Sequence, residues 1–176
     1  RAAAITEELL GPAHPYVAIF RSNVAEALHL QVRAAEALEL YRPALAIVRS
    51  AVGDAHPAVA ELARGAAAAE AALGHREEAE VLLLDAVAIR ERALGPGHPD
   101  LGRALAQLGR LYLDWGRPER ARPALERALA ILEAALGPDS EEVAALRTTL
   151  AEGAMGAVVS TDTAATNHGA GGGADG

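Results

Sequence analysis

A six-residue segment recurs along the sequence every 42 residues. The copies are LGPAHP from Leu10, VGDAHP from Val52, LGPGHP from Leu94 and LGPDSE from Leu136. Four copies in one phase indicate a repeat architecture, in which each copy is one supersecondary unit. A single unit cannot bury its apolar side alone, so successive units must stack and the array presents its function on its surface.

Each repeat has the pattern of two helices, and the third copy (94–135) shows it best. Gly95 ends the preceding helix, and Pro99 suits the first position of the next one, where a backbone N–H has no intrahelical partner. That helix runs to about Trp115, with apolar residues at the spacing of one buried stripe. Gly116 then provides the turn into a second helix. The sequence therefore predicts an all-α solenoid of antiparallel helix pairs.

Composition agrees with closely packed helices and excludes several functions. The chain is rich in Ala and has one Trp, three Tyr and one Phe. A net charge of −8 argues against nucleic-acid binding, which needs a concentrated basic face. The chain has no Cys for a disulfide or a thiolate site, and no apolar run long enough to cross a membrane. We expect a soluble cytoplasmic protein without a cofactor, and the use of Arg in place of Lys suggests a high-GC bacterium.

Repeat three also carries the residues of a known motif, namely Leu105, Leu108, Gly109, Tyr112, Ala121, Leu125 and Ala128. This spacing resembles the tetratricopeptide repeat, with Leu in the places of that family's Trp and Phe. The 42-residue period is longer than the usual 34 residues and is similar to the kinesin-light-chain class. The resemblance covers roughly residues 1–155. It implies a right-handed α–α superhelix that serves protein–protein interaction.

The repeat phase divides the chain into six parts. They are the end of a truncated earlier repeat (1–10), repeats one (11–51), two (52–93) and three (94–135), a partial fourth repeat or capping helix (136–156), and a Gly-, Ala- and Thr-rich tail (157–176). Residues 1–10 have apolar residues that a preceding helix would cover, so we expect the C-terminal part of a larger bacterial signalling or regulatory protein. The tail is too poor in apolar residues to order.

The first two repeats depart from this pattern. Val32 stands where the later repeats have a turn Gly, and Pro43 lies inside a second helix, where it predicts a bend near Arg42. Ala67 and Glu70 replace the Gly and Tyr of repeat three, which predicts a smaller core in repeat two.

Residue types that carry chemistry do not form a site. His14, His56 and His98 recur with the period, but equivalent residues lie a helix layer of about 8–10 Å apart. Zn²⁺ needs each ligand nitrogen within about 2.1 Å. We therefore interpret these three residues as structural groups where each first helix starts. Pairs of adjacent Glu residues near helix starts are explained by the helix dipole. No metal, cofactor or catalytic site is predicted, and the protein is not expected to be an enzyme.

The resemblance implies that first-helix residues line a concave face. Carried over to this sequence, the positions are Ile19, Ser22, Glu26, His29 and Leu30; Glu61, Arg64, Ala68, Ala71 and Ala72; and Arg103, Ala106, Arg110, Leu113 and Asp114. Asn23 and Gln107 share a further inner position, and Arg147 lies in the fourth first helix. The candidate partner-binding residues are Ser22, Asn23, Glu26, His29, Glu61, Arg64, Arg103, Gln107, Arg110, Asp114 and Arg147.

Two functions remain open at this point. The Arg residues of the C-terminal half could form a trough for a partner peptide that carries a carboxylate or an acidic stretch. Alternatively, the array is a structural spacer or a self-association arm, because Ala68, Ala71 and Ala72 offer no large anchor for a partner. The oligomeric state is not predicted. A solvated or packed role is favoured for His29, and partial burial against the next repeat is favoured for Trp115.

Overall fold

A computed structural model describes residues 7–166 of the chain, with side chains through residue 153. The first helices of the successive pairs are α2 (Pro15–Leu30), α4 (Pro57–Ala72), α6 (Pro99–Asp114) and α8 (Glu141–Thr166). The second helices are α3 (Ala34–Val52), α5 (Arg76–Leu94) and α7 (Pro118–Leu136). Residues 7–10 are also helical.

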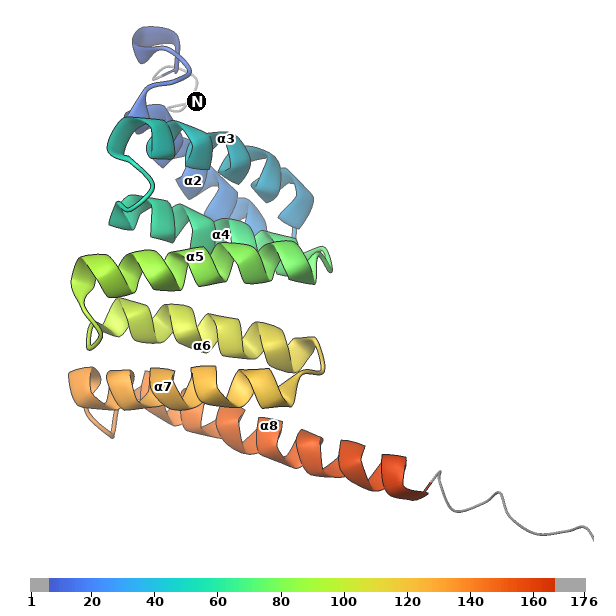
Figure 1. Ribbon diagram of the computed structural model, residues 1–176. Helices are drawn as coiled ribbons and strands as arrows, with labels where there is room; N and C mark the ends of the chain where they lie inside the picture. The colour runs from blue at the N-terminus through green and yellow to red at the C-terminus, as the bar shows by residue number, and fades with distance from the viewer. Residues whose placement is uncertain (1–6, 167–176) are drawn as a thin grey trace, which may run out of the picture.

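The helices stack one after another into an elongated array (Figure 1). Each helix packs mainly against its neighbours in the chain, with weaker contacts between the first helices α2 and α4 and between α6 and α8. The helix bounds repeat at the interval of the sequence motif, so α4 and α6 have the same length and place in their repeats. The predicted all-α solenoid of antiparallel helix pairs is confirmed.

Local residue chemistry explains where the first helices begin. His14, His56 and His98 are the N-cap residues of α2, α4 and α6, and each is followed by Pro. The imidazole Nδ1 of each His accepts a hydrogen bond from the backbone N–H of the second helical residue, at 3.3, 3.1 and 3.2 Å. This bond satisfies one of the N–H groups that a helix start leaves unpaired. The structural role predicted for the three His residues is confirmed.

The turn inside each helix pair needs a left-handed backbone. Gly74 and Gly116 have φ of 83° and 70° there, and Val32 has φ of 62° in the equivalent turn of repeat one. Glycine adopts this conformation freely, whereas a β-branched side chain is strained in it. The Val32 side chain is almost fully exposed and gains no packing in return.

We expect Val32→Gly to raise the free energy of unfolding by about 1 kcal/mol, because it removes the strain of a β-branched residue at positive φ. Urea unfolding followed by circular dichroism measures the change. The matched control is Gly74→Val, which creates the same strained turn in repeat two and should destabilise the chain. A loss of stability in Val32→Gly would contradict the assignment of strain to this turn.

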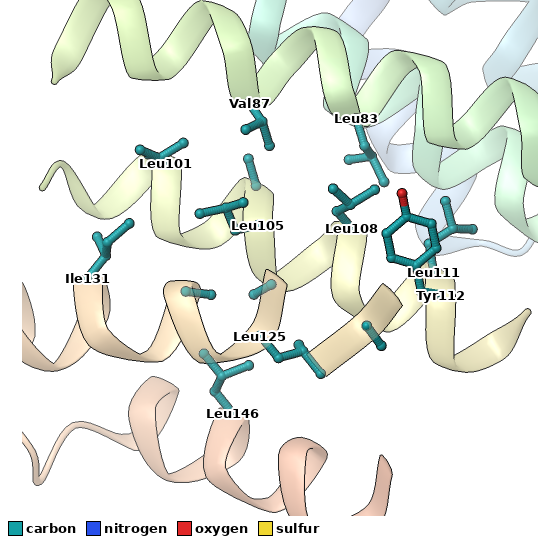
Figure 2. Packing of buried hydrophobic residues seen from close by; sticks show 14 of the residues in the cluster. Leu83, Val87, Leu101, Leu105, Leu108, Leu111, Tyr112, Leu125, Ile131 and Leu146 are labelled. Atoms are coloured by element: carbon teal, nitrogen blue, oxygen red, sulfur yellow. The ribbon is translucent and has the colours of Figure 1, made fainter. Parts of the chain in front are cut away.

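Two adjoining sets of buried side chains form the core. One lies between α5, α6, α7 and α8, and Figure 2 shows part of it, with Leu108 of α6 pointing toward Leu83 of α5. The other lies between α2, α3, α4 and α5 and is built largely from Ala, with Tyr41 as its largest side chain. The smaller core predicted for repeat two agrees with this difference.

Close approach of two helices explains the Gly inside α6. A Cβ atom built on Gly109 would meet the side chain of Leu125 in α7 and would lie 3.4 Å from the backbone oxygen of Ala121. Gly109 therefore lets the two helices of repeat three touch, as the resemblance implies.

One expectation about helix continuity needs correction. The repeat phase predicts a capping helix that ends by residue 156 and a disordered tail after it, but α8 continues to Thr166. The segment after residue 156 has no Pro to stop it, and most of its residues are compatible with a helix. Residues 167–176 lie outside the described part of the chain. The helix α3 is continuous through Pro43, as α7 is through Pro123, and the bend near Arg42 stays a prediction.

Candidate partner-binding groove

A cavity of about 600 Å³ lies along the first helices α4, α6 and α8. We call it the first-helix groove. Ala106 and Gln107 of α6 line it, together with the buried side chains of Leu132 of α7 and Leu146 of α8. Its charged lining consists of four Arg side chains and three carboxylates, namely Arg64, Arg90, Arg103, Arg110, Glu61, Asp100 and Glu142.

Five of the predicted partner-binding residues meet in this groove. They are Glu61, Arg64, Arg103, Gln107 and Arg110. They come from repeats two and three, because residues of α4 and α6 about one period apart line the same cavity.

One half of the groove contains a chain of charges centred on Glu61. Its carboxylate accepts hydrogen bonds from Arg64 at 2.5 Å and from Arg90. Burial raises the pKa of Glu61, but the hydrogen bonds and charges of Arg64 and Arg90 outweigh it, so the pKa lies below its ordinary value. Arg90 is buried, and its second amino group donates to the backbone oxygen of Asp100 at 3.0 Å.

The other half contains a second charge cluster, which ties α6 to α8. The Arg103 guanidinium donates to Glu142 of α8 at 3.0 Å and to Asp100 at 2.8 Å. Hydrogen bonding to Glu142 raises the pKa of Arg103 above its ordinary value. The prediction of an Arg-lined trough is therefore wrong in one respect, because Glu61 of the same helix compensates Arg64 and Glu142 of α8 compensates Arg103.

Arg110 differs from the other Arg residues of the groove. It is exposed, and among the described residues no carboxylate lies within ion-pair distance of its guanidinium. Gln107 lies one turn before it and donates from its side-chain amide to the backbone oxygen of Arg64 at 3.3 Å, which fixes the amide at the groove floor. Arg110 and Asp114 also line an adjoining cavity of about 460 Å³ that extends toward Gly153 of α8.

The remaining predicted residues lie outside the first-helix groove. The Ser22 hydroxyl donates to the backbone oxygen of Ile19 at 2.8 Å, and Asn23 and Glu26 are exposed on α2. His29 lines a separate cavity at the turn between α2 and α3. Arg147 points toward α7, where it donates to Glu133 at 2.6 Å and to the backbone oxygen of Pro138.

Trp115 is half-buried against the core of repeat three, and the Arg117 guanidinium lies 3.7 Å from the centre of its ring. The partial burial predicted for this residue is confirmed.

Three charged groove residues were missed by sequence reasoning, namely Arg90, Asp100 and Glu142. Arg90 could have been found, because its equivalents in the other repeats are Val48 and Leu132, both buried. A charged residue at a core position needs a partner, and that partner is Glu61. Glu142 gave no such signal, because charged residues near a helix start are usual.

Two further observations bear on the kind of site. The described part of the chain contains no group of three His, Asp or Glu side chains that could hold a metal ion. Within residues 7–166, no helix combines the length and the hydropathy that a membrane span requires.

Comparison with known proteins gives the family context of this groove. The family model described as "Tetratricopeptide repeat" matches residues 16–92 and 77–134, which together make up more than half of the chain. No curated protein matches this chain.

Solved structures support the same fold. The nearly identical TPR-like repeats of an assigned kinesin light chain from Podosopora anserina are 26% identical, with a TM-score of 0.75 over 91% of this chain and 76% of that one. BtubC (BKLC) from P. vanneervenii is 20% identical, with a TM-score of 0.75 over 92% of this chain and 69% of that one. The Sgt2 TPR domain from Aspergillus fumigatus is 21% identical, with a TM-score of 0.57 over 90% and 87%.

Proposed function

Because this chain belongs to the tetratricopeptide repeat family, we propose that it is a protein–protein interaction module that holds an extended segment of a partner in the first-helix groove. Members of this family are generally non-catalytic scaffolds for proteins or peptides. The single observation that carries the proposal is Arg110, a cation in the groove that has no ion-pair partner among the described residues.

Charge in the groove favours a partner segment with a carboxylate. The lining has one more guanidinium than carboxylates, on a chain whose net charge is −8. Arg64 and Arg103 already donate hydrogen bonds to Glu61 and Glu142. Arg110 is therefore the guanidinium that is available to a bound carboxylate. A guanidinium group binds a carboxylate through two parallel hydrogen bonds, which fix the orientation of the carboxylate as well as attract it.

Gln107 and Ala106 fit an extended backbone. The Gln107 amide is held at the groove floor by its bond to Arg64, so its side-chain oxygen is available to a partner N–H. Ala106, with its small side chain, lines the groove beside it and lets a peptide chain approach the helix. A partner would thus make one charged contact at Arg110 and backbone contacts along α6.

The test is Arg110→Glu, with peptides selected from a phage-displayed random library against the unchanged chain. We expect the variant to bind the selected peptides at least tenfold more weakly, because it replaces attraction of a carboxylate by repulsion; fluorescence anisotropy measures the Kd. Arg92→Glu is the matched control, since Arg92 is exposed on α5 and the change in net charge is the same. Equal weakening in both variants would show a net-charge effect and contradict the groove.

A second candidate function is self-association. The observation that favours it is the set of exposed apolar residues on α2, where Tyr16, Ile19 and Leu30 are 60%, 48% and 78% exposed. Sedimentation velocity over a range of concentrations separates the two functions. A self-association arm dimerises, and Ile19→Ser with Leu30→Ser abolishes the dimer, whereas neither result is expected of a peptide receptor.

We also propose the setting suggested by the sequence, a cytoplasmic array within a larger bacterial signalling protein. The use of Arg in place of Lys supports a high-GC bacterium, and the lack of Cys is compatible with a reducing interior. The residues encoded before Arg1 in the parent gene test this part, because they would show whether a signalling domain precedes the array.

A further inference from the structure

A second groove lies between the second helices α3 and α5. We call it the second-helix groove. Its cavity has a volume of about 450 Å³, and α4 forms its floor through Ala66 and Glu70. Its walls include Leu38 and Leu45 of α3 and Val81 and Leu82 of α5. Leu38 is buried, whereas Val81 is 67% exposed, so apolar surface runs from the floor to the rim.

The corresponding place one repeat later is filled by large side chains. Leu108 and Tyr112 of α6 stand at the positions of Ala66 and Glu70, and in Figure 2 both point toward Leu83 of α5. Both are at most 5% exposed, and the Arg120 guanidinium covers the Tyr112 ring at 4.4 Å. The groove in repeat two is therefore open because Ala66 is small and because Glu78 replaces Arg120.

Three carboxylates, those of Glu70, Glu77 and Glu78, line this groove beside its apolar walls. Glu70 is buried, accepts from Arg42 at 3.0 Å and lies 2.7 Å from the His75 imidazole. Glu77 and Glu78 are exposed at the rim, and among the described residues neither has an ion-pair partner. Arg42 neutralises one of these three carboxylates, so two negative charges remain beside an open apolar surface.

We propose that the second-helix groove is a docking site for a segment of a partner protein that carries one large apolar side chain next to Lys or Arg residues. The apolar side chain fills the space that Leu108 and Tyr112 fill in repeat three, and it removes Val81 and Leu82 from water. The flanking basic residues pair with Glu77 and Glu78. This segment differs in charge from the one proposed for the first-helix groove, so one chain can hold two different partners.

The two grooves offer opposite charges to a partner. In the first-helix groove the group without a partner is the Arg110 cation, whereas at the second-helix groove the unpaired groups, among the residues that the structure describes, are the carboxylates of Glu77 and Glu78. Complementary charge selects between partners and speeds their encounter more than it adds affinity. Affinity at the second-helix groove therefore rests on the apolar anchor, and selectivity rests on the two Glu residues.

The experiment selects a phage-displayed random peptide library on the full chain and measures the enriched peptides by fluorescence anisotropy. We expect a class of peptides with an aromatic or large aliphatic residue beside Lys or Arg. Ala66→Leu, which fills the groove with the side chain found at position 108, should weaken this class at least tenfold. Glu77→Lys with Glu78→Lys should do the same, and added salt should reduce the second effect. Arg110→Glu, in the other groove, should leave this class unchanged.

A stability measurement and a second substitution show whether Ala66→Leu acts on binding or on folding. We expect Ala66→Leu to unfold at a temperature no lower than the unchanged chain; if it is destabilised, Val81→Ser, at an exposed position, replaces it in the test. The proposal is overturned if no basic and apolar class is enriched, or if its binding is unaffected by the groove variants. It is also overturned if the chain dimerises and Ala66→Leu abolishes the dimer, because the occupant is then a second copy.

Discussion

Replacing Gly109 with Leu is expected to lower the free energy of unfolding by about 3 kcal/mol. Gly109 lies inside α6 and is buried where α6 crosses α7. A side chain there must displace Leu125, which is 1% exposed, and it meets the Ala121 backbone oxygen. Leu is a good helix former, so the expected loss comes from packing and not from helix propensity.

Chemical denaturation followed by circular dichroism measures this loss, and the chain provides a matched control. Gly97→Leu should change stability by less than about 0.5 kcal/mol, because a Cβ at position 97 has no atom within 4 Å and other repeats have Ala13, Ala55 and Asp139 there. Adding Leu125→Ala to Gly109→Leu should restore part of the stability, since it empties the space that the new side chain needs. Purely additive losses would contradict the proposed contact.

Raising the pH from 10 to 12 is expected to remove about 2 kcal/mol of stability through Tyr112. Burial, with the hydrogen bond that the Tyr112 hydroxyl donates to Glu80 at 2.7 Å, raises the pKa of this residue to about 12. In the unfolded chain the pKa is about 10. The folded state therefore favours the protonated hydroxyl. Its contribution is complete below pH 10 and is lost as the pH rises toward 12.

The difference between the unchanged chain and Tyr112→Phe isolates this effect. The pKa of Tyr41 is also raised, chiefly by burial, so part of the alkaline loss remains in the variant. We expect Tyr112→Phe to be less stable by about 1 kcal/mol at pH 7, because Glu80 loses one hydrogen bond, and to show a smaller loss between pH 10 and 12. Tyr16→Phe, at the exposed end of α2, is the control and should follow the unchanged chain. Equal alkaline losses in the chain and Tyr112→Phe would refute the assignment.

Most of the fold could be predicted because its signals are local. Each first helix from α2 to α6 starts with the same pair of residues, a His that caps the helix and a Pro that begins it. Each turn inside a pair needs a left-handed residue, so Val32 could be recognised as the substitute for a Gly. The end of α8 was predicted wrongly because the chain after residue 156 has no Pro or other strong stop signal before Thr166.

The groove was only partly predictable, because its chemistry depends on how neighbouring repeats are placed. First-helix positions identified Arg64, Gln107 and Arg110 as residues of one surface. Sequence could not show that Arg103 would pair with Glu142, because the two are joined only when α8 packs on α6 in one register. The distinction between a compensated Arg103 and an open Arg110 arises from that packing, and it changes which Arg residue a partner would meet.

The central claim, that the first-helix groove holds a partner, is tested most directly by site-specific photo-crosslinking. A benzophenone amino acid replaces Gln107 at the groove floor or, as a control, Arg92 on the outer side of α5. The account predicts that a peptide with a carboxylate, selected on the unchanged chain, is captured at position 107 and not at position 92, and that Arg110→Glu abolishes the capture. Capture at position 92 but not at position 107 would contradict it.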